Sequence, residues 1–220
     1  MSAYKKYDDR LNEILDVSQN LFIAKGYAKT TVNDILDGVG ISKGAFYYYF
    51  KSKEDVMDTV ITRMVEEARI TAQAIAEKPD LSAGEKFYQI LTSQNVEGNH
   101  TADIIEELHH EDNSAMHQKS LVETILALSP ILAEVVKQGI KEGVCNTPYP
   151  LESVEFLFTA VQFLLDPGLF HWSPQELLRR VNASIYIMEL VLGTPRGSFN
   201  WLLKMNEQIL GETLEDTGQQ

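Results

Sequence analysis

Cysteine is nearly absent from this chain, because Cys145 is its only one among 220 residues. An internal disulfide is therefore excluded, and a cysteine-based metal cluster would lack its other ligands. No apolar run reaches the roughly 18 residues of a membrane-spanning helix, and the N-terminus lacks the apolar segment of a secretion signal. Glycine-rich phosphate loops and recognisable nucleophile–base motifs are missing too. These absences predict a cytoplasmic protein with no membrane partner and no cofactor, and they argue against an enzyme.

Acidic residues are in excess, but they are unevenly distributed. The net charge of −13 would by itself argue against a nucleic-acid partner. Residues 1–64 carry nine Lys or Arg and nine Asp or Glu, so the whole excess of acid lies in residues 65–220. No acidic residue occurs between Asp37 and Glu54. That window contains three lysines: Lys43, Lys51 and Lys53. One short basic segment is thus available to a negatively charged partner.

Apolar residues recur at helical spacing along most of the chain, and no convincing strand pattern is present, so the sequence predicts an all-α fold. Capping residues, glycines and prolines divide the chain into segments. The predicted helices are a first helix closed by Gly26, then 31–38, 42–49, 52–76, 82–97, about 101–111, 114–143 with a kink at Pro130, 151–165, 174–193 and 198–211. No internal repeat interrupts this series.

The short helices 31–38 and 42–49 are separated by a three-residue turn that contains Gly40. This spacing is typical of a helix-turn-helix, whose second helix enters the major groove of DNA. The alternative is an ordinary helical hairpin with an aromatic core and solubilising lysines.

An aromatic run in the second of these helices favours the DNA-binding interpretation. Phe46 and Phe50 lie four residues apart and share a face, which we expect to pack in the core. Tyr47 and Tyr48 then point outward, where their hydroxyls can reach phosphates. Gly44 has no side chain and would let the helix backbone approach a duplex closely. The next predicted helix begins at Ser52, and the free backbone N–H groups at its start predict a phosphate-binding site.

Several motifs fall together in the same region: Gly26-Tyr27, Thr30-Thr31-Val32, Ile35, Gly40-Ile41-Ser42-Lys43-Gly44, Tyr47-Tyr48-Tyr49-Phe50 and Lys51-Ser52-Lys53-Glu54. In these motifs the chain resembles the TetR family of bacterial transcriptional repressors over about residues 8–60. The resemblance implies a homodimer that binds a double-stranded DNA operator and a small-molecule effector. It also implies DNA contacts by Thr31, Val32, Ser42, Lys43, Gly44, Tyr47, Tyr48 and, through a phosphate, Lys53.

Two residues depart from the family pattern. Ala45 stands where many relatives carry a polar residue, so base recognition there is limited to a thymine methyl group. Tyr49 stands where histidine is common, which leaves its outward contact undefined.

The resemblance also implies a domain organisation. Residues 1–50 would form a three-helix DNA-binding domain, and residues 51–220 a larger helical domain for ligand binding and dimerisation, with helix 52–76 joining the two. Two later segments have wide apolar faces and would form a four-helix interface in a two-fold dimer. The predicted interface residues are Phe158, Val161, Val181, Ile185 and Met188. The alternative is that both helices are buried within one subunit.

A polar cluster around Glu106 and His109 forms a Glu-x-x-His unit, as in di-iron helical bundles. A second unit, Glu97-Gly98-Asn99-His100, has a Gly-Asn centre typical of a helix break. We therefore expect a solvated helix end and no metal. The alternative function is an all-helical metal-dependent oxidoreductase using Glu106 and His109, and a third is an interaction module without a ligand. The favoured prediction is a ligand-responsive repressor that an effector releases from a palindromic operator, with effector and pocket residues unknown.

Overall fold

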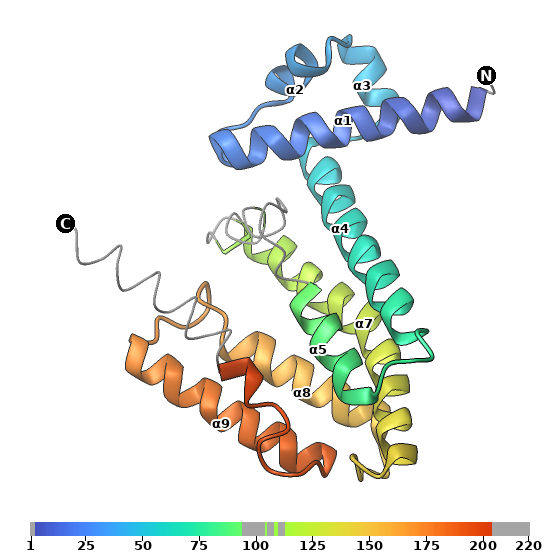
Figure 1. The fold of residues 1–220 in the computed structure, drawn as a ribbon. Coiled ribbons are helices and arrows are strands. Elements are labelled where there is room, and N and C mark those ends of the chain that lie inside the picture. Colours follow the sequence, from blue (N-terminus) through green and yellow to red (C-terminus); the bar gives the residue numbers. More distant parts are fainter. Residues whose placement is uncertain (1–2, 94–103, 105–107, 110–112, 204–220) are drawn as a thin grey trace. The chain divides into compact units, whose positions relative to one another are not determined.

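A computed structural model of the chain describes residues 3–93, 104, 108–109 and 113–203. The elements of this part are all helices (Figure 1): α1 (Ala3–Lys25), α2 (Val32–Val39), α3 (Lys43–Tyr49), α4 (Lys53–Ala76), α5 (Ala83–Ser93), α7 (Ser114–Glu142), α8 (Pro150–Leu164) and α9 (Pro174–Leu192). The all-α prediction is confirmed for the described residues. The expected helix at 101–111 lies mostly outside them, as does most of the one at 198–211.

Local capping residues set both ends of α9 at the positions that the sequence predicts. Ser173 caps α9 in a reciprocal box with Glu176, which is the pattern read from the sequence. The same helix ends at Gly193, whose φ of 63° is a left-handed conformation that glycine adopts without strain. The helix expected at 31–38 runs one residue further, because Gly40 and not Gly38 takes the left-handed capping position.

Packing divides the chain into two compact units. The first comprises residues 1–69 and 95–124, and the second residues 70–94 and 125–220. This division differs from the functional boundary expected at residue 50, because α4 and α7 are continuous helices that each contribute residues to both units. In the first unit, α2 and α3 lie against α1 (Figure 1).

The core of the first unit is shared by the three N-terminal helices and the first half of α4. Its largest fully buried side chains include Ile14, Phe22, Ile35, Phe46, Met57 and Ile61, and Ile104 joins them from outside these helices. Because α4 supplies part of this core, the helix-turn-helix and the start of α4 form one packed body. A displacement of α4 must therefore act on the helices beside it.

The core of the second unit lies among α5, the second half of α7, α8 and α9. Val181 and Ile185, which the sequence assigned to a dimer interface, belong to this core and are only 5 % and 6 % exposed. A side chain buried in its own subunit has no surface left for a partner, so both assignments are corrected. Phe158 and Met188 also pack against the core, and Val161 is half-buried.

Within the described part of the chain, no helix combines the length and the apolar character that crossing a bilayer requires.

Candidate nucleic-acid interface

The start of α2 is held by a network of charge-assisted hydrogen bonds. The Thr31 hydroxyl accepts from the Asp34 amide at 3.1 Å, and the Asp34 carboxylate accepts from the Thr31 amide at 2.7 Å. The same carboxylate accepts from the Lys25 ammonium at 2.6 Å. These donors, Lys25 first, hold the pKa of Asp34 well below its usual range. The network ties the end of α1 to the start of α2 and orients Thr31.

The turn between α2 and α3 is built from one glycine and one cap. Gly40 has a φ of 72°, and its amide donates to the Leu36 carbonyl at 2.9 Å. Two residues later, the Ser42 hydroxyl accepts from the Ala45 amide at 3.2 Å and so begins α3. This geometry confirms the helix–turn–helix spacing read from the sequence.

One face of α3 is buried and the other is exposed, as the spacing of its aromatic residues predicts. Phe46 and Phe50 are buried, with ring centroids 5.9 Å apart. Tyr47 and Tyr48 lie on the other side and are 49 % and 72 % exposed. Their hydroxyls can donate to phosphate oxygens. The outward face of α3 is therefore polar, aromatic and free of acidic groups.

Gly44 leaves the backbone of α3 open on this outward face, because it has no side chain. A Cβ atom added there would meet no protein atom within 4 Å. Packing inside the chain thus does not require glycine at this position, whereas close approach of another molecule would.

Of the eight residues predicted to contact DNA, six are exposed and two are half-buried. The exposed ones are Thr31, Ser42, Lys43, Gly44, Tyr47 and Tyr48. Val32 is half-buried and packs against the core of the first unit. Lys53 is also half-buried, and its ammonium donates to the Tyr27 carbonyl at 2.7 Å. The structure therefore brings six of these residues to the surface and turns Lys53 toward the protein.

A contact that the sequence reading missed comes from the start of α1. The ring centroid of Tyr7 lies 4.8 Å from that of Tyr49 and 5.9 Å from that of Tyr48. Tyr7 supports α3 from the side and fills the place next to Tyr49, whose surroundings the sequence left undefined. The available signal was helical spacing, since Tyr7 precedes Leu11 by four residues and extends the apolar stripe of α1.

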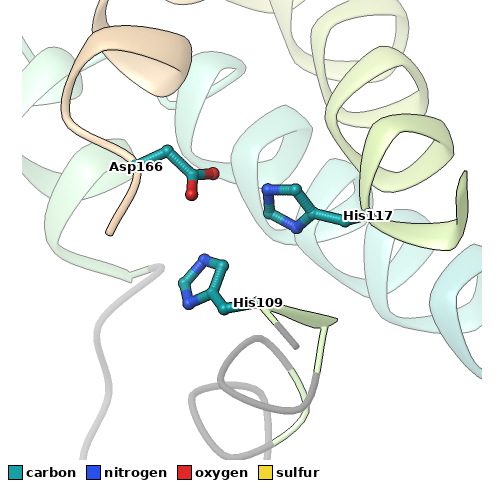
Figure 2. A group of neighbouring side chains, drawn as sticks. All are labelled: His109, His117 and Asp166. Atoms are coloured by element: carbon teal, nitrogen blue, oxygen red, sulfur yellow. The ribbon is translucent and has the colours of Figure 1, made fainter. Parts of the chain in front are cut away.

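The histidine cluster considered as a metal site is described only in part. Glu106 lies outside the described residues. His109 and His117 meet edge to face, with ring centroids 4.9 Å apart (Figure 2). Asp166, also drawn there, belongs to the second compact unit and accepts from the amides of Gly168 and Leu169. Two imidazoles are fewer than the three or four protein ligands of a typical zinc site, so this pair alone defines no metal centre.

Family models match both parts of the chain. One, described as bacterial regulatory proteins of the tetR family, matches residues 14–60. The other, described as a tetracyclin repressor-like C-terminal domain, matches residues 95–186. The first covers the helix-turn-helix and the start of α4, and the second covers α7, α8 and most of α9.

Curated relatives share a shorter region. The HTH-type transcriptional regulator EthR of Mycobacterium tuberculosis is 42 % identical over 72 residues, which are 33 % of this chain and 33 % of that protein. The HTH-type transcriptional repressor KstR2 of Rhodococcus jostii is 42 % identical over 52 residues, which are 24 % of this chain and 26 % of that protein. The chain thus matches about a third or less of the length of these relatives.

Solved structures are similar over most of the chain. A transcriptional regulator from Cytophaga hutchinsonii aligns with 94 % of this chain and 97 % of its own, with a TM-score of 0.59 and 19 % identity, which shows a shared fold. A regulator of the TetR/AcrR family from Thermobifida fusca aligns with 84 % of this chain and 97 % of its own, with a TM-score of 0.56 and 27 % identity.

Proposed function

Because the chain belongs to the TetR family of transcriptional regulators, we propose that it is a repressor that binds a palindromic operator as a homodimer and leaves it when a small-molecule effector binds. The family assignment confirms the expectation of a regulator and not an enzyme. It also removes the alternative of a metal-dependent oxidoreductase built on Glu106 and His109.

The observation that carries the proposal is the outward face of α3. Tyr47, Tyr48 and Lys43 are exposed there around Gly44, where the backbone is open. An α-helix fits the major groove, where lysine can donate to guanine and tyrosine hydroxyls can reach the phosphates on either side. We assign base recognition to Lys43 and phosphate contacts to the tyrosines.

We propose that Thr31, at the start of α2, and Ser42, at the start of α3, extend this face. Both are exposed N-cap residues, so backbone amides at the two helix starts lie beside exposed hydroxyl groups. Backbone amides at helix starts are common phosphate donors and fix the register of a protein on a duplex. We propose that these two residues position the helix pair, while α3 reads the sequence.

Dimerisation is supported by apolar side chains that the subunit leaves uncovered on α8 and α9. Phe156 and Phe163 are seven residues apart on α8 and are 63 % and 53 % exposed. On α9, Ile187 and Leu190 are 46 % and 58 % exposed and lie opposite the buried Val181 side of that helix. Helices α8 and α9 pack side by side (Figure 1), so their outward faces can pair with a second copy. We therefore move the proposed interface to these four residues.

Two-fold symmetry of such a dimer would present two α3 helices to one face of the duplex. Successive major grooves on one face are about 34–36 Å apart, which requires an operator with two half-sites related by symmetry. The two-fold symmetry of the dimer thus supports a palindromic operator.

Release by an effector is supported by the contacts of α4 within the first unit. Its side chains fill the core under the helix-turn-helix, and Asp58 and Thr62 reach α7. The Lys119 ammonium lies 2.7 Å from the Asp58 carboxylate, and the Thr62 hydroxyl donates to Glu123 at 3.2 Å. Both α4 and α7 continue into the second unit. A ligand that shifts either helix would therefore disturb the DNA-binding helices.

The test has two stages. Selection of duplexes from fragmented genomic DNA should return a palindromic site that the purified protein binds as a dimer. Compounds that raise the melting temperature of the free protein are then titrated with and without that duplex. Affinity of the compound should fall in the presence of DNA, because coupling between two ligands is reciprocal. Equal affinities would exclude that compound as an inducer, and failure to select any site would overturn the proposed function.

A further inference from the structure

Three tyrosine rings form a cluster where the start of α1 lies beside α3 (Figure 1). The ring centroid of Tyr7 lies 4.8 Å from that of Tyr49 and 5.9 Å from that of Tyr48, which it meets edge to face. Tyr48 and Tyr49 also meet edge to face, with ring centroids 5.1 Å apart. Each ring therefore contacts both of the others, and Tyr7 joins the start of α1 to the last turn of α3.

The three rings differ in exposure. Tyr48 is 72 % exposed and Tyr7 is 37 % exposed, whereas Tyr49 is half-buried and packs against the core of the first unit. A side chain as exposed as Tyr48 ordinarily samples several χ1 rotamers in water. Contact with two neighbouring rings restricts this sampling, because aromatic pairs favour particular relative orientations. The cluster thus orders a side chain that its exposure alone would leave free to rotate.

Tyr47, the other exposed tyrosine of α3, is held in a different way. Its ring meets the buried Phe46 edge to face, with ring centroids 5.4 Å apart. Phe46 belongs to the core of the first unit, so Tyr47 is supported from within the helix-turn-helix. Tyr48 is supported in part by Tyr7, which comes from another helix.

We propose that Tyr7 is a positioning residue for DNA binding, whose ring holds Tyr48 in the orientation in which the Tyr48 hydroxyl meets a phosphate. A side chain that must be ordered on binding weakens affinity by a factor of about two to ten. A ring that is already ordered avoids this loss, so Tyr7 contributes to affinity through Tyr48 and without contacting DNA itself. This inference rests on the proposed DNA-binding function and on the phosphate contact assigned there to Tyr48.

Two substitutions separate the ring of Tyr7 from its hydroxyl. Tyr7→Leu removes the aromatic ring, whereas Tyr7→Phe removes only the hydroxyl. On a duplex that the wild-type protein selects from a random library, we expect a Kd about tenfold weaker for Tyr7→Leu, since a dimer carries the cluster twice. Tyr7→Phe should bind as the wild type does. A weaker Kd in Tyr7→Phe would show that Tyr7 itself donates to DNA and would overturn the inference, as would an unchanged Kd in Tyr7→Leu.

Combination with substitutions in α3 shows whether Tyr7 acts through Tyr48. The loss caused by Tyr7→Leu should nearly vanish in a Tyr48→Phe background, because the hydroxyl that Tyr7 positions is no longer present. Tyr47→Phe is the matched control, and the loss should persist in full in that background. A loss that persists in both backgrounds is the result expected of general destabilisation, and it would overturn the inference.

The rotamer of Tyr48 in the protein without DNA gives an independent readout. Three-bond couplings between its Hα and Hβ protons distinguish a single χ1 rotamer from an average over several. We expect a single rotamer in the wild type and in Tyr7→Phe, and an average in Tyr7→Leu. An averaged wild type, or a single rotamer in Tyr7→Leu, would overturn the positioning role. If no duplex is selected, the proposed function fails, whereas this measurement still tests whether Tyr7 orders Tyr48.

Discussion

A Cβ atom added to Gly193 would lie only 2.4 Å from the carbonyl oxygen of Asn146, closer than such atoms can approach. The loop before α8 passes directly against the end of α9, and the Asn146 amide donates to the Leu192 carbonyl at 2.8 Å. Gly193 also has a positive φ of 63°. Two separate constraints, one conformational and one steric, thus act on the same residue.

Gly193→Ala should therefore destabilise the protein more than strain in the left-handed region alone would. That strain costs about 1–2 kcal/mol, and displacement of the Asn146 backbone adds to it. Gly143→Ala is the control, because Gly143 has a φ of 75° but an added Cβ meets nothing within 4 Å. Urea unfolding should show the larger loss for Gly193→Ala. Equal losses would mean that the Asn146 loop moves away without cost.

Stability and DNA binding should change in opposite directions in Gly44→Ala. Alanine is better than glycine inside a helix by roughly 0.5–1 kcal/mol, and the added methyl group meets no protein atom. The same methyl group would stand between α3 and the duplex, so affinity should fall. Gly84→Ala in α5 is the matched control, since that site is equally open. It should gain stability without any change in DNA binding. Unchanged affinity in Gly44→Ala would place the duplex away from Gly44.

Substitutions on the two sides of α9 should separate folding from assembly. Leu190→Glu places a charge on the outward apolar face, and a charge buried in an interface costs several kcal/mol. Sedimentation velocity should then show folded monomers. Val181→Glu places the charge in the core of the subunit and should unfold it, as circular dichroism would report. A Leu190→Glu variant that remains fully dimeric would locate the interface elsewhere.

Two substitutions on α3 should affect DNA recognition differently. Tyr48→Phe removes a hydroxyl assigned to a phosphate and should weaken binding to all sequences about equally. Lys43→Ala should also relax sequence preference, because a base contact contributes roughly 1–3 kcal/mol of discrimination. Titration of the protein with selected and unrelated duplexes measures the first effect, and selection from a random library measures the second. An unaltered preference in Lys43→Ala would remove this lysine from base recognition.

Acid should destabilise the capped helices. Hydrogen bonds from Ser173 lower the pKa of Glu176, and those from Ser82 lower the pKa of Glu85. A carboxyl group whose pKa is lower in the folded state stabilises it above the pKa of the unfolded chain, near 4.3, and loses that contribution as the pH falls through the folded value. The free energy of unfolding should therefore decrease below about pH 4. Glu176→Gln should reduce this decrease, and an identical pH profile would show that Glu176 has no part in it.

Local features were readable from the sequence because their physics involves neighbours in the chain. The capping boxes at Thr31 and Ser173 need only a hydroxyl and a carboxyl group three residues apart. The faces of α3 follow from helical periodicity, which separates Phe46 from Tyr47 whatever lies around them. The motifs that mark the family are of the same local kind.

Tertiary packing decided the points that depend on distant partners. Helix α9 carries apolar residues on more than one face, so periodicity could not tell whether Val181 or Leu190 meets the core of the subunit. Tyr7 reaches Tyr49 across 42 positions of sequence. Lys53 is a cation in a basic segment, and only the fold of residues 26–30 brings carbonyl oxygens to it. The sequence determined which helices form and which family they belong to, whereas contacts between residues far apart in the chain determined which side chains remain free for DNA or a second subunit.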